Sequence, residues 1–379
     1  MTRVTAVVVC PAEASEAQGF INRDRLLLAS LRPEHEVTVV GVVARPAEAL
    51  DLVDVPVVGP ELLGRPSGML GRLWRLLSLR TGRLSASERR LRDVIAETEP
   101  DVILVLSLWN VELVRCARTV APTAFFAEER LGRSTAPGGG RTVSISRLLR
   151  RAELASASGL PAVAVLRGDD VAWATERFSS PVVVVPHGID VAYWEAEVDP
   201  SIDAGPVDVV AVANLTMART ARPLAEVIDR LEDRGWPDGL RLRLVSAAGY
   251  HPSLLEREGR GVELLGAVED PRPLYRSAAA TLVPAFEANG VKNGIIQGWA
   301  IGCPVVTTPV SAATVGGKDR ADLLVGEDPG ALAGLLEGLA SRDDLVEIAA
   351  AGRRHLEERF SSTAHDAAVA GLVASLARR

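Results

Sequence analysis

Short apolar runs alternate with amphipathic segments along the first half of the chain. The runs are rich in valine, leucine and isoleucine, which is typical of strands buried on both faces of a parallel sheet. They lie at residues 4–9, 36–43, 102–106, 123–127, 162–166 and 182–185. Segments with the 3.6-residue period of a helix lie at 23–31, 87–97, 111–119, 143–157 and 170–178. This order predicts a series of βα units.

The same alternation resumes after residue 206. Strand-like runs lie at 207–213, 241–245, 262–265, 281–283 and 304–307, and helical patterns at 221–234, 295–301 and toward the end. An acidic, proline-containing segment separates the two series. We predict α/β domains at 1–190 and 207–360, a linker at 191–206 and a last helix at 361–379. Two doubly wound sheets in tandem bind ligands at the carboxyl ends of their strands.

Composition narrows the class of protein. The 379 residues are 47% hydrophobic and 24% charged, with a net charge of −7, so a basic nucleic-acid-binding domain is not expected. No apolar run approaches the roughly 20 residues of a membrane span, and we expect a cytoplasmic protein. Cys10, Cys116 and Cys303 lack metal-site spacing and are expected in the core. Lysine is rare beside arginine, as in proteins from GC-rich actinobacterial genomes.

The stretch at 284–309 carries the clearest chemistry. A strand-like run ends at Pro284, a loop reaches Gly290 and a helix follows. Free amides at a helix N-terminus attract anions, and glycine lets a phosphate approach the backbone. Lys292 would add a positive charge. The local residues fit equally an ordinary strand–helix turn with a solvated lysine.

The order of these residues resembles the donor-binding motif of glycosyltransferase family four and its GT-B relatives. The matching positions are Gly290, Val291, Lys292, Asn293, Ala300, Gly302, Pro304, Val305 and Val306. Residues 182–190 and 264–270 are also similar to segments of that family. The resemblance implies two tandem Rossmann-like domains facing an interdomain cleft, with the C-terminal helix crossing back to the first domain.

The resemblance also implies where a nucleoside-diphosphate sugar binds. The expected donor-binding residues are Asn214, Arg219, Val268, Glu287, Asn289, Gly290, Val291, Lys292, Gln297 and Gly19. Several positions depart from the family pattern, among them Asn289, which stands where the family has the first acid of its paired glutamates. Gly294 stands where the family has a second lysine, and Gln297 where a glutamate binds the donor ribose. Asn214 stands where an arginine is usual.

What the resemblance implies about the reaction is sugar transfer with retention of configuration and without a metal. Arg219 and Lys292 are candidate catalytic residues because cations stabilise the leaving diphosphate. Glu128 is a candidate to orient or deprotonate the acceptor. The small-molecule, lipid or saccharide acceptor is expected on the first domain, at Asn22, Arg23, Trp109, Asn110 and Glu129. No cofactor is expected, since the nucleotide sugar is a substrate, and an actinobacterial role in natural-product or envelope biosynthesis would fit.

Two other functions remain open at the level of sequence. The same fold can serve a nucleotide-sugar epimerase or phosphorylase, since fold does not fix reaction. The replaced charged residues also fit a catalytically weak nucleotide-binding partner subunit.

The segment 65–93 adds a separate feature. It holds eight arginines against Glu88 and Asp93, and leucines beside the arginines would suit a helix at an anionic membrane surface. The alternative is an amphipathic helix packed on the sheet with its arginines in water.

Overall fold

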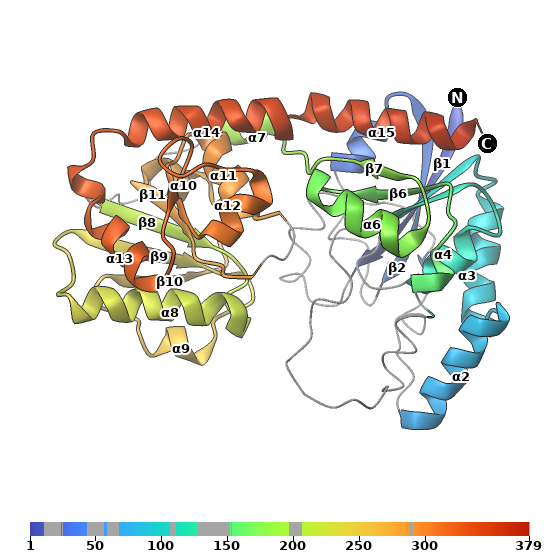
Figure 1. Cartoon of the computed structure of the whole chain (residues 1–379), viewed down its shortest axis with the longest axis horizontal. Coiled ribbons are helices and arrows are strands. Elements are labelled where there is room, and N and C mark those ends of the chain that lie inside the picture. The colour runs from blue at the N-terminus through green and yellow to red at the C-terminus, as the bar shows by residue number, and fades with distance from the viewer. Residues whose placement is uncertain are drawn as a thin grey trace. The chain divides into compact units, whose positions relative to one another are not determined.

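The computed structural model describes residues 1–10, 24, 26–43, 57–58, 68–106, 111–127, 152, 154–196, 207–287 and 291–378. These residues form two compact units. The first holds the described residues up to His187 together with those from His365 onward, and the second holds those from Gly188 to Ala364. Figure 1 shows both units, each built on one sheet with helices against it.

The first unit contains a seven-stranded sheet in the order β3-β2-β1-β4-β5-β6-β7, with every pairing parallel. Its strands are β1 (Thr2–Cys10), β2 (His35–Val43), β3 (Val57–Val58), β4 (Val102–Leu106), β5 (Thr123–Phe126), β6 (Ala162–Val165) and β7 (Val182–Val184). Its helices include α2 (Gly68–Thr81), α3 (Ala86–Glu97), α4 (Val111–Ala117), α6 (Val171–Phe178) and α15 (Ser362–Ala377). All side chains of β4, β5 and β6 are buried, as the continuous apolar runs predict.

The second unit contains a six-stranded parallel sheet in the order β10-β9-β8-β11-β12-β13. Its strands are β8 (Val207–Val212), β9 (Leu240–Val245), β10 (Val262–Gly266), β11 (Ala280–Val283), β12 (Val305–Thr307) and β13 (Leu324–Val325). Its helices are α7 (Val191–Glu195), α8 (Ala218–Asp233), α9 (Pro252–Leu255), α10 (Arg272–Ser277), α11 (Asn293–Ile301), α12 (Pro309–Val315), α13 (Pro329–Glu337) and α14 (Leu345–Phe360). The predicted class, two Rossmann-like α/β domains, is therefore confirmed.

Side chains alternate between two hydrophobic cores on the faces of the second sheet. Val209 and Ala211 of β8 belong to the core under α8 and α13, whereas Val210 belongs to the core that includes residues of α11. Successive residues of a strand point to opposite faces, so a run of small aliphatic residues fills both cores. This explains why every residue of β8 except Asp208 is apolar.

Among the described residues the chain passes between the units twice, and a hydrogen bond within one unit lies beside each passage. In the second unit the Ile189 amide donates to the Phe360 carbonyl at 3.1 Å. In the first unit the His365 ring Nδ1 lies 2.8 Å from the Pro186 carbonyl oxygen. Most of α15 thus belongs to the first unit, although α14 directly before it belongs to the second.

The segment expected to link the domains, 191–206, begins with the helix α7 of the second unit. Its Trp194 is buried, and the Arg276 guanidinium of α10 donates to the carbonyls of Trp194, Glu195 and Ala196. Residues 197–206 lie outside the described part of the chain.

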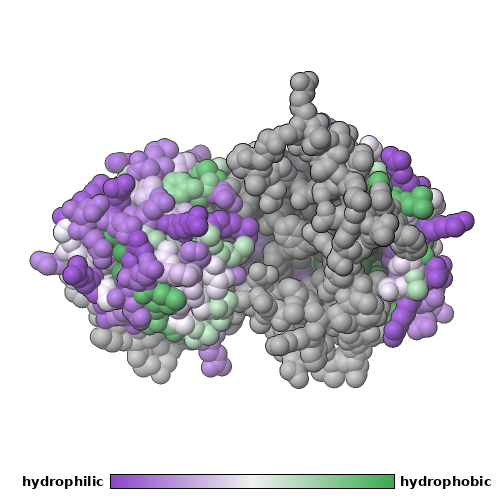
Figure 2. Space-filling view, turned by 90° about the horizontal axis from the view of Figure 1, so that it is seen from below, coloured by the Kyte–Doolittle hydropathy of each residue, from purple (hydrophilic) through white to green (hydrophobic). Residues whose placement is uncertain are grey.

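Hydrophilic residues dominate the surface of the second unit on the face drawn in Figure 2, and two cysteines are buried. None of the helices in the described ranges is both long and apolar enough to span a bilayer. Figure 2 shows that the coloured surface of the second unit on this face is mostly hydrophilic, with small separate hydrophobic areas. Cys116 and Cys303 are buried, and burial raises the pKa of each thiol to about 12, which makes both unreactive.

Candidate nucleotide-sugar site

Two helices of the second unit begin at the same edge of its sheet. Strands β8 and β11 are adjacent and parallel, and α8 and α11 follow their carboxyl ends. A methyl group built on Gly294, in the first turn of α11, would lie 4.0 Å from the Val212 carbonyl and 3.0 Å from Val283. The N-terminus of α11 therefore lies against the ends of both strands, where ligands of open α/β sheets bind.

Neither α8 nor α11 has a side-chain cap, a feature they share with α10 and α14 of this unit. The N-cap residues are Met217 for α8 and Lys292 for α11, and neither side chain accepts a hydrogen bond from the first turn. In contrast, Thr308 caps α12 and Asp328 caps α13. Uncapped backbone amides at the end of a helix form a ready site for an anion.

Two cationic side chains accompany these amides. Arg219 is the second residue of α8 and is exposed, and its guanidinium lies 3.5 Å from the Met217 sulfur. Lys292 is half-buried at the N-cap of α11. Each helix end thus combines backbone amides with one full positive charge, which is the arrangement that the anion-site hypothesis requires.

Two enclosed polar atoms in these segments have no partner among the described residues. The Asn214 side-chain oxygen accepts from the Thr216 amide at 3.1 Å and from the Thr216 hydroxyl at 2.6 Å, but its Nδ2 has no acceptor. The Asn293 side-chain oxygen likewise has no donor. Buried polar atoms nearly always have partners, so these two indicate a polar ligand at the helix ends.

Gln297 is held by a tyrosine that the sequence did not reveal. The hydroxyl of the fully buried Tyr275 donates to Gln297 Oε1 at 3.1 Å. The two residues are 22 positions apart, on the separate helices α10 and α11. No local pattern could have paired them, because the contact depends on how the two helices pack.

Packing explains one departure from the family motif. A methyl group on Gly294 would already be 3.0 Å from Val283 Cγ2, so a lysine would push α11 away from the strand. Four residues on, a methyl group on Gly298 would be 2.7 Å from Thr281. The two glycines let α11 lie closer to the sheet than larger residues would allow.

Hydroxyl groups of β12 and of the start of α12 hold the loop that follows β11. The Ser311 hydroxyl donates to the Ala285 carbonyl at 2.8 Å, and the Thr308 hydroxyl donates to the same oxygen. The Thr307 hydroxyl donates to the Val283 carbonyl at 2.8 Å. These bonds hold the backbone that leads toward the proposed donor loop.

The remaining predicted donor residues have mixed positions. Val268 and Val291 are half-buried and pack against the core that contains Trp299, and Glu287 is exposed at the end of the described loop. Asn289, Gly290 and Gly19 lie outside the described residues. So do the candidate catalytic Glu128 and the acceptor candidates Asn22, Arg23, Trp109, Asn110 and Glu129.

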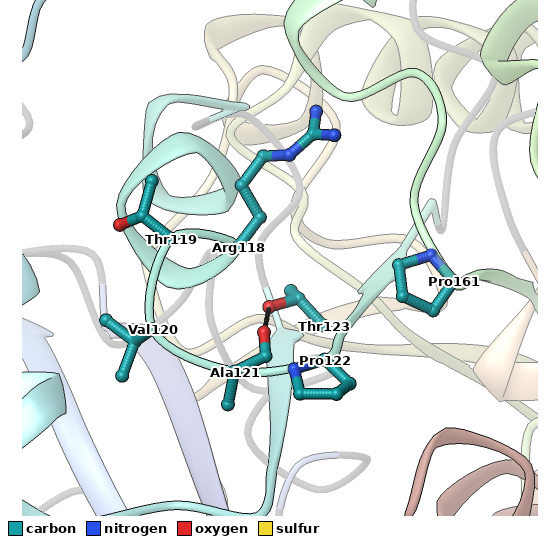
Figure 3. Close-up of a pocket in the computed structure, with 7 residues that line it drawn as sticks. All are labelled: Arg118, Thr119, Val120, Ala121, Pro122, Thr123 and Pro161. Carbon is teal, nitrogen blue, oxygen red and sulfur yellow. Dashed lines mark hydrogen bonds between the residues drawn. The ribbon is translucent and has the colours of Figure 1, made fainter. Parts of the chain in front are cut away.

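Other features of the structure do not compete with this site. A cavity of about 280 Å³ opens beside the start of β5, and Figure 3 shows its lining, formed by Arg118, Thr119, Val120, Ala121, Pro122, Thr123 and Pro161. It lies at the amino ends of β5 and β6, opposite the edge where ligands of parallel sheets bind. Within the described ranges, no three His, Cys, Asp or Glu side chains are grouped as a metal site would require.

One protein family matches the segment that contains this site. Residues 206–342 match the family model of group 1 glycosyl transferases, which spans β8 to α13 and so includes both uncapped helices. A comparison with curated proteins finds no significant match.

Solved structures are similar over nearly the whole chain. Anabaena HepE in complex with UDP and glucose has a TM-score of 0.75 at 13% identity, covering 99% of this chain and 100% of that one. Sucrose-phosphate synthase from Thermosynechococcus elongatus has a TM-score of 0.70 at 14% identity, covering 99% of both chains. A glycosyltransferase from Rickettsia africae ESF-5 has a TM-score of 0.70 at 14% identity, covering 99% and 97%.

The fold and the matched segment define a glycosyltransferase of the GT-B class. Residues 206–342, most of its second unit, match group 1 glycosyl transferases, in agreement with the likeness to family four.

Proposed function

We propose that this chain transfers a sugar from a nucleoside-diphosphate sugar to a small-molecule, lipid or saccharide acceptor, with retention and without a metal ion. One observation carries the proposal. Two uncapped helix N-termini, each with its own cation, begin at adjacent strand ends inside the segment that matches group 1 glycosyl transferases. A diphosphate has the charge and the acceptor oxygens that this arrangement would satisfy.

The chemistry required of the site is mainly electrostatic. Breaking the bond between the sugar and the diphosphate leaves negative charge on the phosphate oxygens, which fixed donors stabilise. Arg219, Lys292 and the first amides of α8 and α11 would supply this stabilisation in place of a divalent cation. The unpartnered Asn214 amide group, in the loop before α8, can donate one further hydrogen bond.

The sugar and the base are assigned by analogy. HepE has been crystallised with UDP-glucose, which makes a uridine nucleotide the first donor to test. Gln297 is proposed to contact the ribose, and Val268 to lie near the base. Glu128 and the acceptor residues proposed from the sequence would act from the first unit.

The test begins with direct binding of UDP, GDP and ADP to the purified protein in the presence of a chelator. The tightest ligand is then measured against Arg219→Ala and Lys292→Ala. Each substitution should weaken binding by about 1.5–3 kcal/mol, the usual value of a hydrogen bond to a charged group. Arg230→Ala is the matched control, because Arg230 is an exposed arginine in the last turn of the same helix.

Unchanged affinity in both site variants would place the nucleotide elsewhere. If binding is lost with chelator and restored by Mg²⁺ or Mn²⁺, the metal-free part of the proposal is wrong. Product analysis with the matching nucleotide sugar would then show whether the anomeric configuration is retained.

A further inference from the structure

The amide of Gln297 is fixed in one orientation by a buried hydroxyl. Tyr275 is completely buried in α10, and its ring packs edge-on against Trp194 with the centroids 5.7 Å apart. A methyl group on Gly294 would lie 3.9 Å from the Tyr275 oxygen. The hydroxyl is therefore enclosed beside the first turn of α11, and it reaches Gln297 but not solvent.

The structure gives the direction of this hydrogen bond. The Tyr275 hydroxyl donates to Gln297 Oε1 at 3.1 Å, and burial raises the pKa of Tyr275, so the hydroxyl keeps the proton that it donates. An amide side chain has one acceptor, the oxygen, and two donors on nitrogen. The oxygen of Gln297 is used by Tyr275, so the NH₂ group faces away from that tyrosine. No described residue accepts a hydrogen bond from it.

We propose that Tyr275 is a positioning residue that presents the Gln297 NH₂ group to the donor ribose, so that this chain recognises the ribose by donating hydrogen bonds to it. This inference rests on the proposed function. It makes the subsite opposite in polarity to a glutamate, whose carboxylate can only accept. A ribose hydroxyl can do both, so either residue permits binding, but the two differ in which modified nucleotides they tolerate.

The experiment uses the full-length protein and the tightest-binding nucleoside diphosphate identified above. Its probes are the 2′- and 3′-deoxy forms of that nucleotide and the corresponding 2′- and 3′-fluoro-deoxy forms. Fluorine accepts a hydrogen bond weakly but cannot donate one. At the hydroxyl that contacts Gln297, the wild type should lose about tenfold in affinity with the deoxy form, as for one hydrogen bond, and only about threefold with the fluoro form.

In Gln297→Glu the order of the two analogues should reverse. The carboxylate has no proton to donate to fluorine and repels it, so the fluoro form should bind at least about tenfold more weakly than the parent nucleotide. If the fluoro form is penalised as strongly as the deoxy form in the wild type, Gln297 does not act as a donor and the inference is overturned.

The role of Tyr275 is tested by a double-mutant cycle. Tyr275→Phe keeps the ring that packs on Trp194 and removes only the hydroxyl. It should weaken binding about three- to tenfold in the wild type and have no further effect in Gln297→Ala, because coupled residues are not additive. Tyr193→Phe, an exposed tyrosine on α7, is the matched control and should bind normally.

Additive effects in the double variant would mean that Tyr275 acts only through general packing, which overturns its positioning role. Chemical denaturation of each variant shows which of them remain folded. If no nucleoside diphosphate binds the wild type, the proposed function itself fails. If one binds but Gln297→Ala has the wild-type affinity, this inference alone fails.

Discussion

Asp208 is the residue on which a buried charge network in the second unit depends. Its carboxylate is 1% exposed and accepts from Arg241 at 2.7 and 2.8 Å, with Arg243 at 3.5 Å. Glu263 lies 3.1 Å from Arg243 on the other side. The charges lie across β8, β9 and β10, on the sheet face that also carries Val210 and Val245.

Asp208→Asn should destabilise the protein by about 3 kcal/mol. Removing one member of a buried ion pair leaves the other charge without compensation, here mainly on Arg241, whose shortest contacts are with Asp208. Asp233→Asn makes the same chemical change in an exposed pair with Arg230 and should cost less than about 0.5 kcal/mol. Urea denaturation measures both. Equal stability of the two variants would show that the network is not energetically coupled.

The candidate site shows which residues can be identified from sequence. Arg219 and Lys292 were predicted from the resemblance to the donor-binding segments of glycosyltransferase family four, and the structure places each at the start of a helix. Tyr275 was not, because its bond to Gln297 joins helices 22 residues apart. Gly294 was interpreted only as a replaced lysine, whereas the structure shows that it also packs tightly against Val283, with 3.0 Å between a built methyl group and Val283 Cγ2. Local sequence patterns predict the strands, loops and helix starts that form a site. The contacts of its side chains depend on how the helices pack and are not predicted from local sequence.

Two glycines inside the last helices have opposite requirements. A methyl group on Gly352 of α14 would lie 2.2 Å from Trp299 Cδ1 and 2.8 Å from the Asp322 carbonyl. One on Gly371 of α15 would meet no described atom within 4 Å. Helix α14 thus packs so close to α11 that position 352 has no room for a side chain. Position 371 of α15 has room for one.

Gly352→Ala should lower the free energy of unfolding by about 2–3 kcal/mol, as overpacking does. Gly371→Ala should raise it by about 0.5–1 kcal/mol, because alanine favours the helix and lowers the entropy of the unfolded chain. Thermal or chemical denaturation distinguishes them. The same sign for both substitutions would contradict the packing of α14 on α11.

We propose that α2 and the start of α3 form a contact surface for anionic lipid. None of the described side chains of α2 is buried, and Leu77 is 60% exposed. Arg80, Arg83, Arg89 and Arg90 are exposed on these helices and the turn between them, and Glu88 is neutralised by the buried Arg115 at 3.1 Å. An exposed apolar side chain beside arginines suits the surface of a negatively charged bilayer.

Replacing Arg80, Arg83 and Arg90 together with alanine should weaken binding to phosphatidylglycerol vesicles about 100-fold, at about 1 kcal/mol for each charge. Phosphatidylcholine vesicles should bind neither protein, and salt should weaken the interaction by screening. The control removes the same charge from the second unit, at Arg230, Arg260 and Arg320. If the wild type ignores both vesicle types, these helices have only a structural role.

At the scale of the whole molecule, the alternation of strands and helices predicted the architecture, with domains at 1–190 and 207–360 and a last helix at 361–379. In the described part of the chain the crossings between the units fall at residues 187–188 and 364–365. The segment 191–206 was assigned to a linker, yet α7 forms at its start, and Arg272 and Arg276 donate hydrogen bonds to its carbonyls. Long-range contacts of this kind leave no local pattern in the sequence.

The first unit is completed only by the last residues of the chain. Helix α15 buries Val369, Leu372, Val373 and Leu376, and Asp366 accepts a hydrogen bond from Ser30. The second unit is instead formed by one continuous stretch among the described residues, from Gly188 to Ala364. The two units should therefore differ in their response to loss of the C-terminus.

Deleting residues 365–379 should destabilise the first unit and leave the second folded. Hydrogen exchange is expected to accelerate in the sheet of the first unit, because this unit loses the buried side chains of α15, while β8 and β11 stay protected. The nucleoside diphosphate should bind within about threefold of its normal affinity, since its proposed site lies wholly in the second unit. Deleting only residues 378–379 is the control, because it leaves α15 intact. Exchange that accelerates equally in both sheets would show that the units fold as one cooperative body, with α15 stabilising the whole chain.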